Sequence, residues 1–196
     1  MGLHEGSIPR ILAPSGTRGG TIDHDLPTFL GLGPAALLAV TLLAAPAVAD
    51  VFNGDGDANT IVATNGDDTI RGNGGNDVIT ARKGDDTVRG GSGTDKVDAG
   101  QGADTVWGGP GDDVLDVGTA DAHEDAVYGD AGNDHLFLRS TDDARGGLGD
   151  DLIEAVYGAK GMRIDCGAGR DKVIFNQESP KVATTGCERI KVISAG

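Results

Sequence analysis

The chain has 196 residues, of which 31 are acidic and 16 basic, so its formal net charge at pH 7 is −15. It contains 34 glycines, while hydrophobic residues make up 38% and aromatic residues 4%, which is little material for an ordinary packed core. This balance argues against nucleic-acid and anionic-membrane partners, which repel a polyanion, and against collagen, because the glycines do not recur at every third residue. What remains is a disordered acidic chain, or a fold that depends on something other than a large hydrophobic core.

The first predicted element is a secretory signal peptide over residues 1–49. No charged residue occurs within 26–49, and an alanine-rich apolar run ends in Ala47-Val48-Ala49, a pattern typical of cleavage between Ala49 and Asp50. The segment before this run is atypical, because it carries three acidic residues against two basic ones. The alternative is an uncleaved membrane anchor, which the two prolines at 34 and 46 and the cleavage pattern disfavour.

A nine-residue period dominates the region that follows, 50–157. An aliphatic residue stands two positions after each member of an aspartate column, and a glycine two positions before it. The period therefore predicts a solenoid with one structural unit per nine residues. The column consists of Asp68, Asp77, Asp86, Asp95, Asp104 and Asp113, with Asn59 one step before them.

The period slips after Asp113 but does not disappear. Asp134 and Asp151 hold the same place in later units, each followed by an aliphatic residue two positions on. The unit near 138–145 is one residue short and has Ala144 where a larger aliphatic residue belongs, so we expect a distorted coil there.

The C-terminal segment, 158–196, contains degenerate repeats and both cysteines, Cys166 and Cys187. An even number of cysteines in an exported protein favours a disulfide, here closing a loop of about 20 residues. The alternatives are two free thiols or a metal site, although no histidine lies close in the sequence. We expect this segment to form a disulfide-closed cap.

The composition of one unit explains how it folds and why it needs a cation. Six residues rich in Gly, Asn and Asp form a turn, and the next three form a short strand with one buried position. Stacked units bring aspartates about one strand spacing apart, where the carboxylates repel unless a cation lies between them. Calcium suits such sites, because flexible turns offer irregular sets of oxygen ligands.

Three units, 90–98, 108–116 and 146–154, fit the pattern G-G-x-G-x-D-x-U-x. In this respect the chain resembles the hemolysin-type calcium-binding repeat proteins of the RTX group. The resemblance implies an all-β fold, a right-handed parallel β-roll (β-solenoid) with calcium between its turns. The C-terminal segment is similar to the cysteine-closed terminus of secreted actinobacterial members of this group. The implied ligands are the side chains of Asp68, Asp77, Asp86, Asp95, Asp104, Asp113, Asp134 and Asp151 and the turn carbonyls of Gly72, Gly74, Gly90, Ser92, Gly108 and Pro110.

These features predict a secreted or cell-surface-associated calcium-binding protein that binds several ions and folds on binding extracellular calcium. We expect a monomer without nucleic-acid partners, and without membrane contact after signal cleavage. We expect no enzymatic activity, because the chain lacks the H-E-x-x-H and G-x-S-x-G motifs. One alternative is a glycan-recognition or adhesion module that uses a column of outward threonines, Thr69, Thr87 and Thr105, beside Trp107. Another is a remnant appendage of an RTX enzyme or toxin.

Overall fold

The computed structural model describes residues 10–12, 48–119, 123–139, 143–156, 162–176 and 182–193, which form two β-sheets. The first, nine-stranded sheet consists of β1 (Arg10–Leu12), β3 (Asn59–Val62), β5 (Val78–Thr80), β7 (Lys96–Asp98), β9 (Val114–Asp116), β11 (His135–Leu138), β13 (Leu152–Ala155), β15 (Lys172–Phe175) and β17 (Arg189–Val192). The second, eight-stranded sheet consists of β2 (Val51–Asn53), β4 (Thr69–Gly74), β6 (Thr87–Ser92), β8 (Thr105–Pro110), β10 (Ala126–Ala131), β12 (Asp143–Leu148), β14 (Arg163–Ala168) and β16 (Ala183–Thr185).

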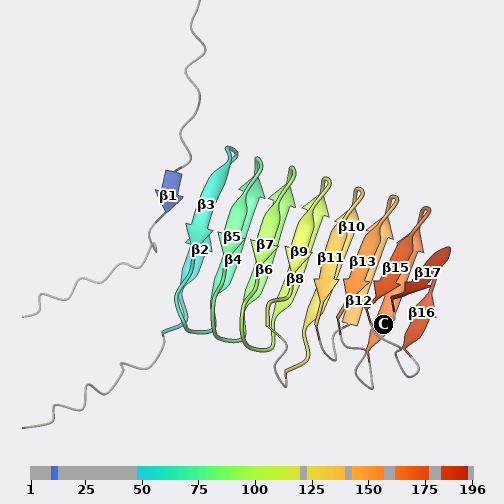
Figure 1. The fold of residues 1–196 in the computed structure, drawn as a ribbon. Helices are drawn as coiled ribbons and strands as arrows, with labels where there is room; N and C mark the ends of the chain where they lie inside the picture. Colours follow the sequence, from blue (N-terminus) through green and yellow to red (C-terminus); the bar gives the residue numbers. More distant parts are fainter. Residues whose placement is uncertain are drawn as a thin grey trace, which may run out of the picture.

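From β2 onward, consecutive strands alternate between the two sheets, so the chain winds as a flattened coil (Figure 1). Each strand pairs in parallel with the strand two places along the chain, as in the register Ile61↔Ile79↔Val97. One full turn of the coil therefore comprises two nine-residue units. The fold is all-β, a parallel β-roll of about seven turns, as the sequence predicts.

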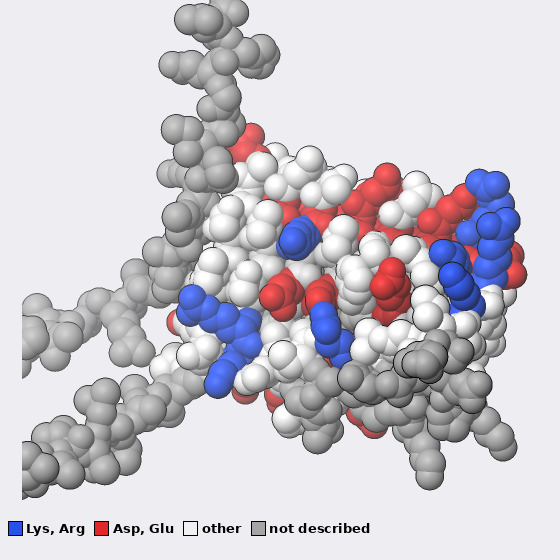
Figure 2. All heavy atoms as spheres, in the orientation of Figure 1, with Lys and Arg blue, Asp and Glu red and all other residues white. Residues whose placement is uncertain are grey.

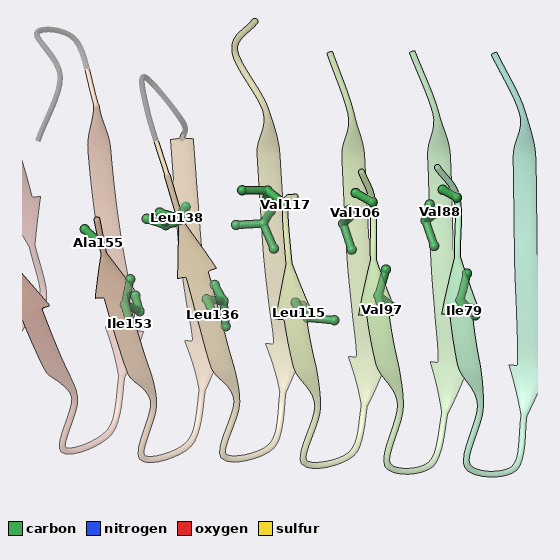
Figure 3. Packing of buried hydrophobic residues seen from close by; sticks show 14 of the residues in the cluster. Ile79, Val88, Val97, Val106, Leu115, Val117, Leu136, Leu138, Ile153 and Ala155 are labelled. Atoms are coloured by element: carbon green, nitrogen blue, oxygen red, sulfur yellow. The ribbon is translucent and has the colours of Figure 1, made fainter. Parts of the chain in front are cut away.

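The core is a thin layer of aliphatic side chains between the two sheets (Figure 3). The second residue of each of β6 to β9 points inward, so that Val88 and Val106 face the core from one sheet and Val97 and Leu115 from the other. All four are at most 1% exposed. Each unit alone buries little apolar surface, and stacking makes the layer continuous.

The strand of the short unit, β12, is regular. It pairs with β10 and β14 in unbroken register, Val127↔Ala144↔Ile164, and Ala144 is buried. The expected distortion is thus absent from β12, and the rest of that connection, 140–142, lies outside the described residues.

The two ends of the roll carry further features. At the N-terminal end, β1 pairs in parallel with β3, while the remainder of the predicted signal peptide, apart from residues 48–49, lies outside the described residues. At the C-terminal end, a disulfide joins Cys166 in β14 to Cys187, which precedes β17. Within the described ranges, no helix is long and apolar enough to cross a membrane.

Candidate metal sites at the edges of the roll

The roll has two edges, which differ in the first residue of their turns. The turns that follow strands of the eight-stranded sheet form the glycine edge, 54–59, 72–77, 90–95, 108–113, 129–134 and 146–151, with a final turn, 166–171, that begins with Cys166. The turns that follow the nine-stranded sheet form the apolar edge, and the first four are 63–68, 81–86, 99–104 and 117–125. In Figure 1 the glycine edge is the row of short, similar turns along the top.

The glycine-rich pattern of these turns follows from their backbone. From the turn 72–77 onward, the second and fourth residues of each glycine-edge turn have positive φ, for example +117° at Gly91 and +128° at Gly93. Glycine adopts such angles without strain, and Asn and Asp tolerate them better than other residues. Accordingly, the two exceptions on the glycine edge are Asn73 (φ +76°) and Asp130 (φ +73°).

The sixth residue of each turn forms a continuous ladder of carboxylates. The backbone N–H of each ladder residue donates to Oδ1 of the aspartate in the next stacked turn, as from Asp77 to Asp95 at 2.8 Å and from Asp95 to Asp113 at 2.8 Å. The turn thereby fixes each side chain in one orientation. On the glycine edge the ladder contains Asn59, Asp77, Asp95, Asp113, Asp134, Asp151 and Asp171, all at most 2% exposed.

The second oxygen of these carboxylates is buried and, within the described structure, accepts no hydrogen bond. This holds for Oδ2 of Asp77, Asp86, Asp95, Asp113, Asp134, Asp151 and Asp171. A buried carboxylate oxygen without a partner is costly, because it has lost its hydration shell and gained nothing in return. A repeated set of such oxygens therefore indicates cation sites that belong to the fold.

The first residue of each glycine-edge turn lies against this free oxygen. A methyl group at Gly90 would lie 2.5 Å from Oδ2 of Asp95 and 2.7 Å from the carbonyl oxygen of Gly108. The same convergence of a carboxylate and a carbonyl oxygen recurs at Gly72, Gly108, Gly129 and Gly146. Only glycine leaves room for these oxygens to meet.

This donor set fits calcium. It combines one carboxylate oxygen per turn with backbone carbonyls, the hard ligands that Ca²⁺ prefers. No group of three or more His, Cys, Asp or Glu side chains in the described ranges is placed to hold a metal, so a cation here would depend on carbonyl oxygens as well. Of the predicted carbonyls, those of Gly72, Gly90 and Gly108 lie at the convergence points.

The other predicted carbonyls are placed differently. Gly74 and Ser92 are register partners at the ends of β4 and β6. Pro110 ends β8 on the exposed side of its turn, and its carbonyl accepts a hydrogen bond from the N–H of Gly93 at 2.9 Å. These three residues are thus not among those that the structure brings against a ladder carboxylate.

Burial raises the pKa of the glycine-edge ladder aspartates above the ordinary value of 3.8. The pKa of Asp113 and of Asp134 is raised to about 7, and that of Asp151 to about 6, chiefly because burial disfavours the charged form. Neighbouring ladder carboxylates raise the pKa further, whereas the hydrogen bond from the preceding backbone N–H lowers it. A divalent cation between the turns would favour the charged form.

One predicted ligand on the apolar edge, Asp68, differs from this scheme. Both oxygens of Asp68 accept hydrogen bonds, Oδ1 from the N–H of Asp50 at 2.7 Å and Oδ2 from the N–H and hydroxyl of Thr64, each at 2.8 Å. Asp104 continues the ladder, since its N–H donates to Oδ1 of Asp125 at 2.8 Å. Asp125, outside the predicted ligand set, is therefore a member of the ladder.

Sequence reasoning missed how the ladder ends. The N–H of Asp171 donates to Oε2 of Glu188 at 2.6 Å, so a glutamate outside the period completes the glycine edge. Glu188 follows Cys187 directly, and the disulfide with Cys166 therefore holds it close to this edge. In the sequence, only the position of Glu188 next to Cys187 indicated its contact with the glycine edge.

A second ladder, also missed, runs along the outside of the same turns. The fifth residue accepts a hydrogen bond from the N–H of its counterpart in the following turn, as in Asp112 with Asn133 at 2.7 Å and Asn133 with Asp150 at 2.8 Å. Figure 2 shows acidic side chains gathered along this upper edge of the face in view. In the sequence, the frequent Asn and Asp at the fifth position of the turns indicated this second ladder.

The architecture and the edge geometry define a cation-binding repeat solenoid. Residues 53–88, 89–122 and 119–136 match the family model described as RTX calcium-binding nonapeptide repeat (4 copies). This part of the chain is thus similar to RTX calcium-binding repeats, and the same roll continues beyond it to β17. A search of curated proteins found no match.

Proposed function

We propose that this chain is a secreted calcium-binding protein whose roll folds when it binds extracellular calcium, and that it has no catalytic activity of its own. The observation that carries the proposal is the row of buried Oδ2 atoms that lack a hydrogen-bond partner within the described residues. Without a cation, these carboxylates are either buried as uncompensated charges or protonated. Bound calcium removes this penalty, so that metal binding contributes directly to folding.

The net charge supports coupling between calcium binding and folding. Residues 50–196 carry 28 acidic and 14 basic side chains and little apolar material, a composition typical of disordered chains. Extracellular calcium modules bind with dissociation constants of about 10⁻⁴–10⁻³ M. A chain with such affinity stays unfolded in the cytosol and folds outside the cell.

Secretion rests on the N-terminal pattern that ends at Ala49, and the disulfide supports it, because disulfides persist in oxidising compartments. The test is mass spectrometry of the protein recovered from culture medium. A chain beginning at Asp50 is expected, and retention of the complete chain in the cell would contradict export.

Calcium-coupled folding is tested by circular dichroism of the chain with EGTA and with millimolar CaCl₂. We expect a disordered spectrum with EGTA and a strand spectrum with calcium, and equal MgCl₂ should not replace CaCl₂, because Mg²⁺ demands regular octahedral geometry. A strand signal that chelation leaves unchanged would contradict calcium-coupled folding. Turnover of hydrolase substrates by the calcium-loaded chain would contradict the absence of catalysis.

The outer face of the eight-stranded sheet does not favour a glycan-stacking platform. Trp107 has the guanidinium of Arg89 at 4.4 Å from its ring centroid, and the ring of Tyr128 stacks with it at 5.4 Å. Because β8 lies between β6 and β10, these neighbours cover opposite faces of the indole ring. The aromatic column is therefore already occupied by its own side chains.

A further inference from the structure

We infer that secreted copies of this chain associate head to tail, so that the end of one roll formed by β16 and β17 (the β17 end) pairs with the end of the next formed by β2 and β3 (the β3 end). This inference rests on the proposed function, because it needs a roll that calcium folds and that is cleaved after Ala49. It replaces the monomer expected from the sequence with an open-ended row of rolls. The partner is a second copy of this chain.

The β17 end exposes residues that occupy core positions. Ile190 is the register partner of the buried Val173, and Val192 is the register partner of Phe175, which belongs to the core cluster. Yet Ile190 is 53% exposed and Val192 is 48% exposed. Solenoids need polar caps at their ends to stay soluble, and these two side chains make this end apolar instead.

The backbone of the β17 end is open as well. β17 is the outermost strand of the nine-stranded sheet and β16 that of the eight-stranded sheet, and no described strand pairs with their outer edges. An uncovered strand edge presents N–H and C=O groups to which another strand can add. A strand that adds in parallel, as β17 itself adds to β15, continues the roll.

At the β3 end, the structure shows that β3 accepts one more parallel strand. β1 pairs with it, and Leu12 is the register partner of the buried Ile61. β1 lies at 10–12, within the segment that cleavage after Ala49 removes. The secreted chain therefore has an open edge at β3, which the complete chain covers with its own N-terminal segment.

β17 of another copy fits the position that β1 leaves. In the parallel register of the roll, Ile190 of one copy takes the core position next to Ile61 of the other, as Val173 does next to Ile190 within one copy. β16 lies next to β2 in the same contact, because consecutive strands alternate between the two sheets. The core layer of one roll thereby covers the exposed end of the core layer of the next, which buries apolar surface on both.

The two ends carry opposite charges. β15 and β17 contain three basic residues and no acidic one, and Figure 2 shows basic side chains gathered at this end of the roll. Residues 48–62, at the other end, contain three acidic residues and no basic one. The basic residues are Lys172, Arg189 and Lys191, and the acidic ones are Asp50, Asp55 and Asp57. Charge therefore favours contact between unlike ends and opposes contact between two β17 ends.

Sedimentation velocity of the secreted chain, which begins at Asp50, tests the association in saturating calcium. The contact involves two short strands, so the test covers protein concentrations from about 10 µM to about 1 mM. We expect the mean mass to rise with concentration without reaching a fixed multiple of the monomer, because head-to-tail contacts do not close. Added NaCl should weaken the association, because salt screens the attraction between the ends.

Two lysine substitutions make a matched pair. Ile190→Lys places a charge at a core position of the edge strand and should raise the dissociation constant about tenfold or more. Leu148→Lys adds the same charge at a leucine that is 63% exposed on the glycine edge, away from both ends, and should leave association unchanged. Circular dichroism in calcium checks that both variants fold. Lys191→Glu, at an exposed residue of β17, should also weaken association and serves if Ile190→Lys does not fold.

A mixing experiment distinguishes head-to-tail contact from contact between identical ends. Ile190→Lys keeps its β3 end, so a small fraction mixed with the unaltered chain should join the assemblies, stop their growth and lower the mean mass. A fixed dimer that this variant does not shorten would overturn the inference, as would equal effects of Ile190→Lys and Leu148→Lys.

The inference and the proposed function fail in different ways. A monomer at every concentration, with a strand spectrum in calcium, would overturn the inference and leave the proposed function standing. A chain that calcium does not fold, or that is not cleaved after Ala49, would contradict the proposed function and the inference with it.

Discussion

Each ladder aspartate divides its two carboxylate oxygens between two tasks. Oδ1 accepts the backbone N–H of the preceding turn, which fixes the side chain, and Oδ2 stays buried without a partner in the described structure. Asn59, at the start of the ladder, differs from the aspartates, because its amide oxygen accepts the N–H of Asp55 within its own turn at 2.8 Å.

The aliphatic residues of the core allow a prediction at the same scale. Leu115 is fully buried between its register partners Val97 and Leu136, so Leu115→Ala leaves a cavity and should lower the free energy of unfolding by about 2–5 kcal/mol. Urea denaturation in calcium measures this change. The matched control is Leu148→Ala, at a leucine that is 63% exposed, where a change within about 0.5 kcal/mol is expected. Equal losses from both substitutions would contradict the packing described for the core.

At the scale of the element, the C-terminal cap ties strand pairing, the disulfide and the ladder together. The disulfide links positions 21 residues apart, and joins β14 to the segment that carries Glu188 and β17. Chain-entropy arguments assign about 3 kcal/mol to a cross-link over a loop of this size. The cap therefore contributes to stability mainly by limiting the unfolded state.

Reduction of this disulfide is predicted to lower the free energy of unfolding by about 3 kcal/mol in saturating calcium, and to expose β17 to hydrogen exchange. Urea denaturation and exchange mass spectrometry with and without dithiothreitol measure both effects. The double variant Cys166→Ala, Cys187→Ala serves as control, because its stability should not respond to the reductant. An unchanged denaturation midpoint on reduction would refute a stabilising role for the cross-link.

At the scale of the whole molecule, the buried carboxylates link folding to pH in opposite senses with and without calcium. In the metal-free roll the pKa of Asp86, Asp113 and Asp134 is about 7, above the ordinary value of 3.8. Groups with a raised folded-state pKa favour folding below the unfolded-state value, and this contribution is lost as the pH rises through the folded-state pKa. Protons and calcium thus neutralise the charge of the same buried carboxylates.

We therefore predict that the calcium-free chain is more ordered near pH 4 than at pH 8, and that the calcium concentration at half-folding rises as the pH falls below about 7. Circular dichroism in metal-free buffers and calcium titrations at several pH values measure these trends. The Asp113→Asn variant should show a weaker dependence on pH. A calcium midpoint independent of pH between 5.5 and 7.5 would contradict the coupling, because the pKa of Asp113 and of Asp134 is raised to about 7.

The period predicted the strands, the core residues and the ladder aspartates because each repeat is a local unit whose side chains alternate strictly. It did not predict that the edges differ, although Gly72 and Gly90 alternate with Ala81 and Ala99 in the sequence. Aligning the sequence at nine residues superimposes the two kinds of turn and hides the difference between them. One full turn of the roll comprises two nine-residue units, one for each edge. The bond to Glu188 was beyond sequence reasoning, because it depends on a cross-linked segment outside the period.

The hydrogen bonds of the ladder formed by the sixth residues all run in one direction along the chain. Each aspartate N–H donates toward the following turn, so a turn is completed by the residues that come after it. A chain exported N-terminus first presents its turns in this order outside the cell, and each newly emerged turn supplies the acceptor for the N–H of the turn before it. A partly folded roll therefore has one ladder N–H without an acceptor, at its most recently formed turn. At the last turn the N–H of Asp171 donates to Glu188.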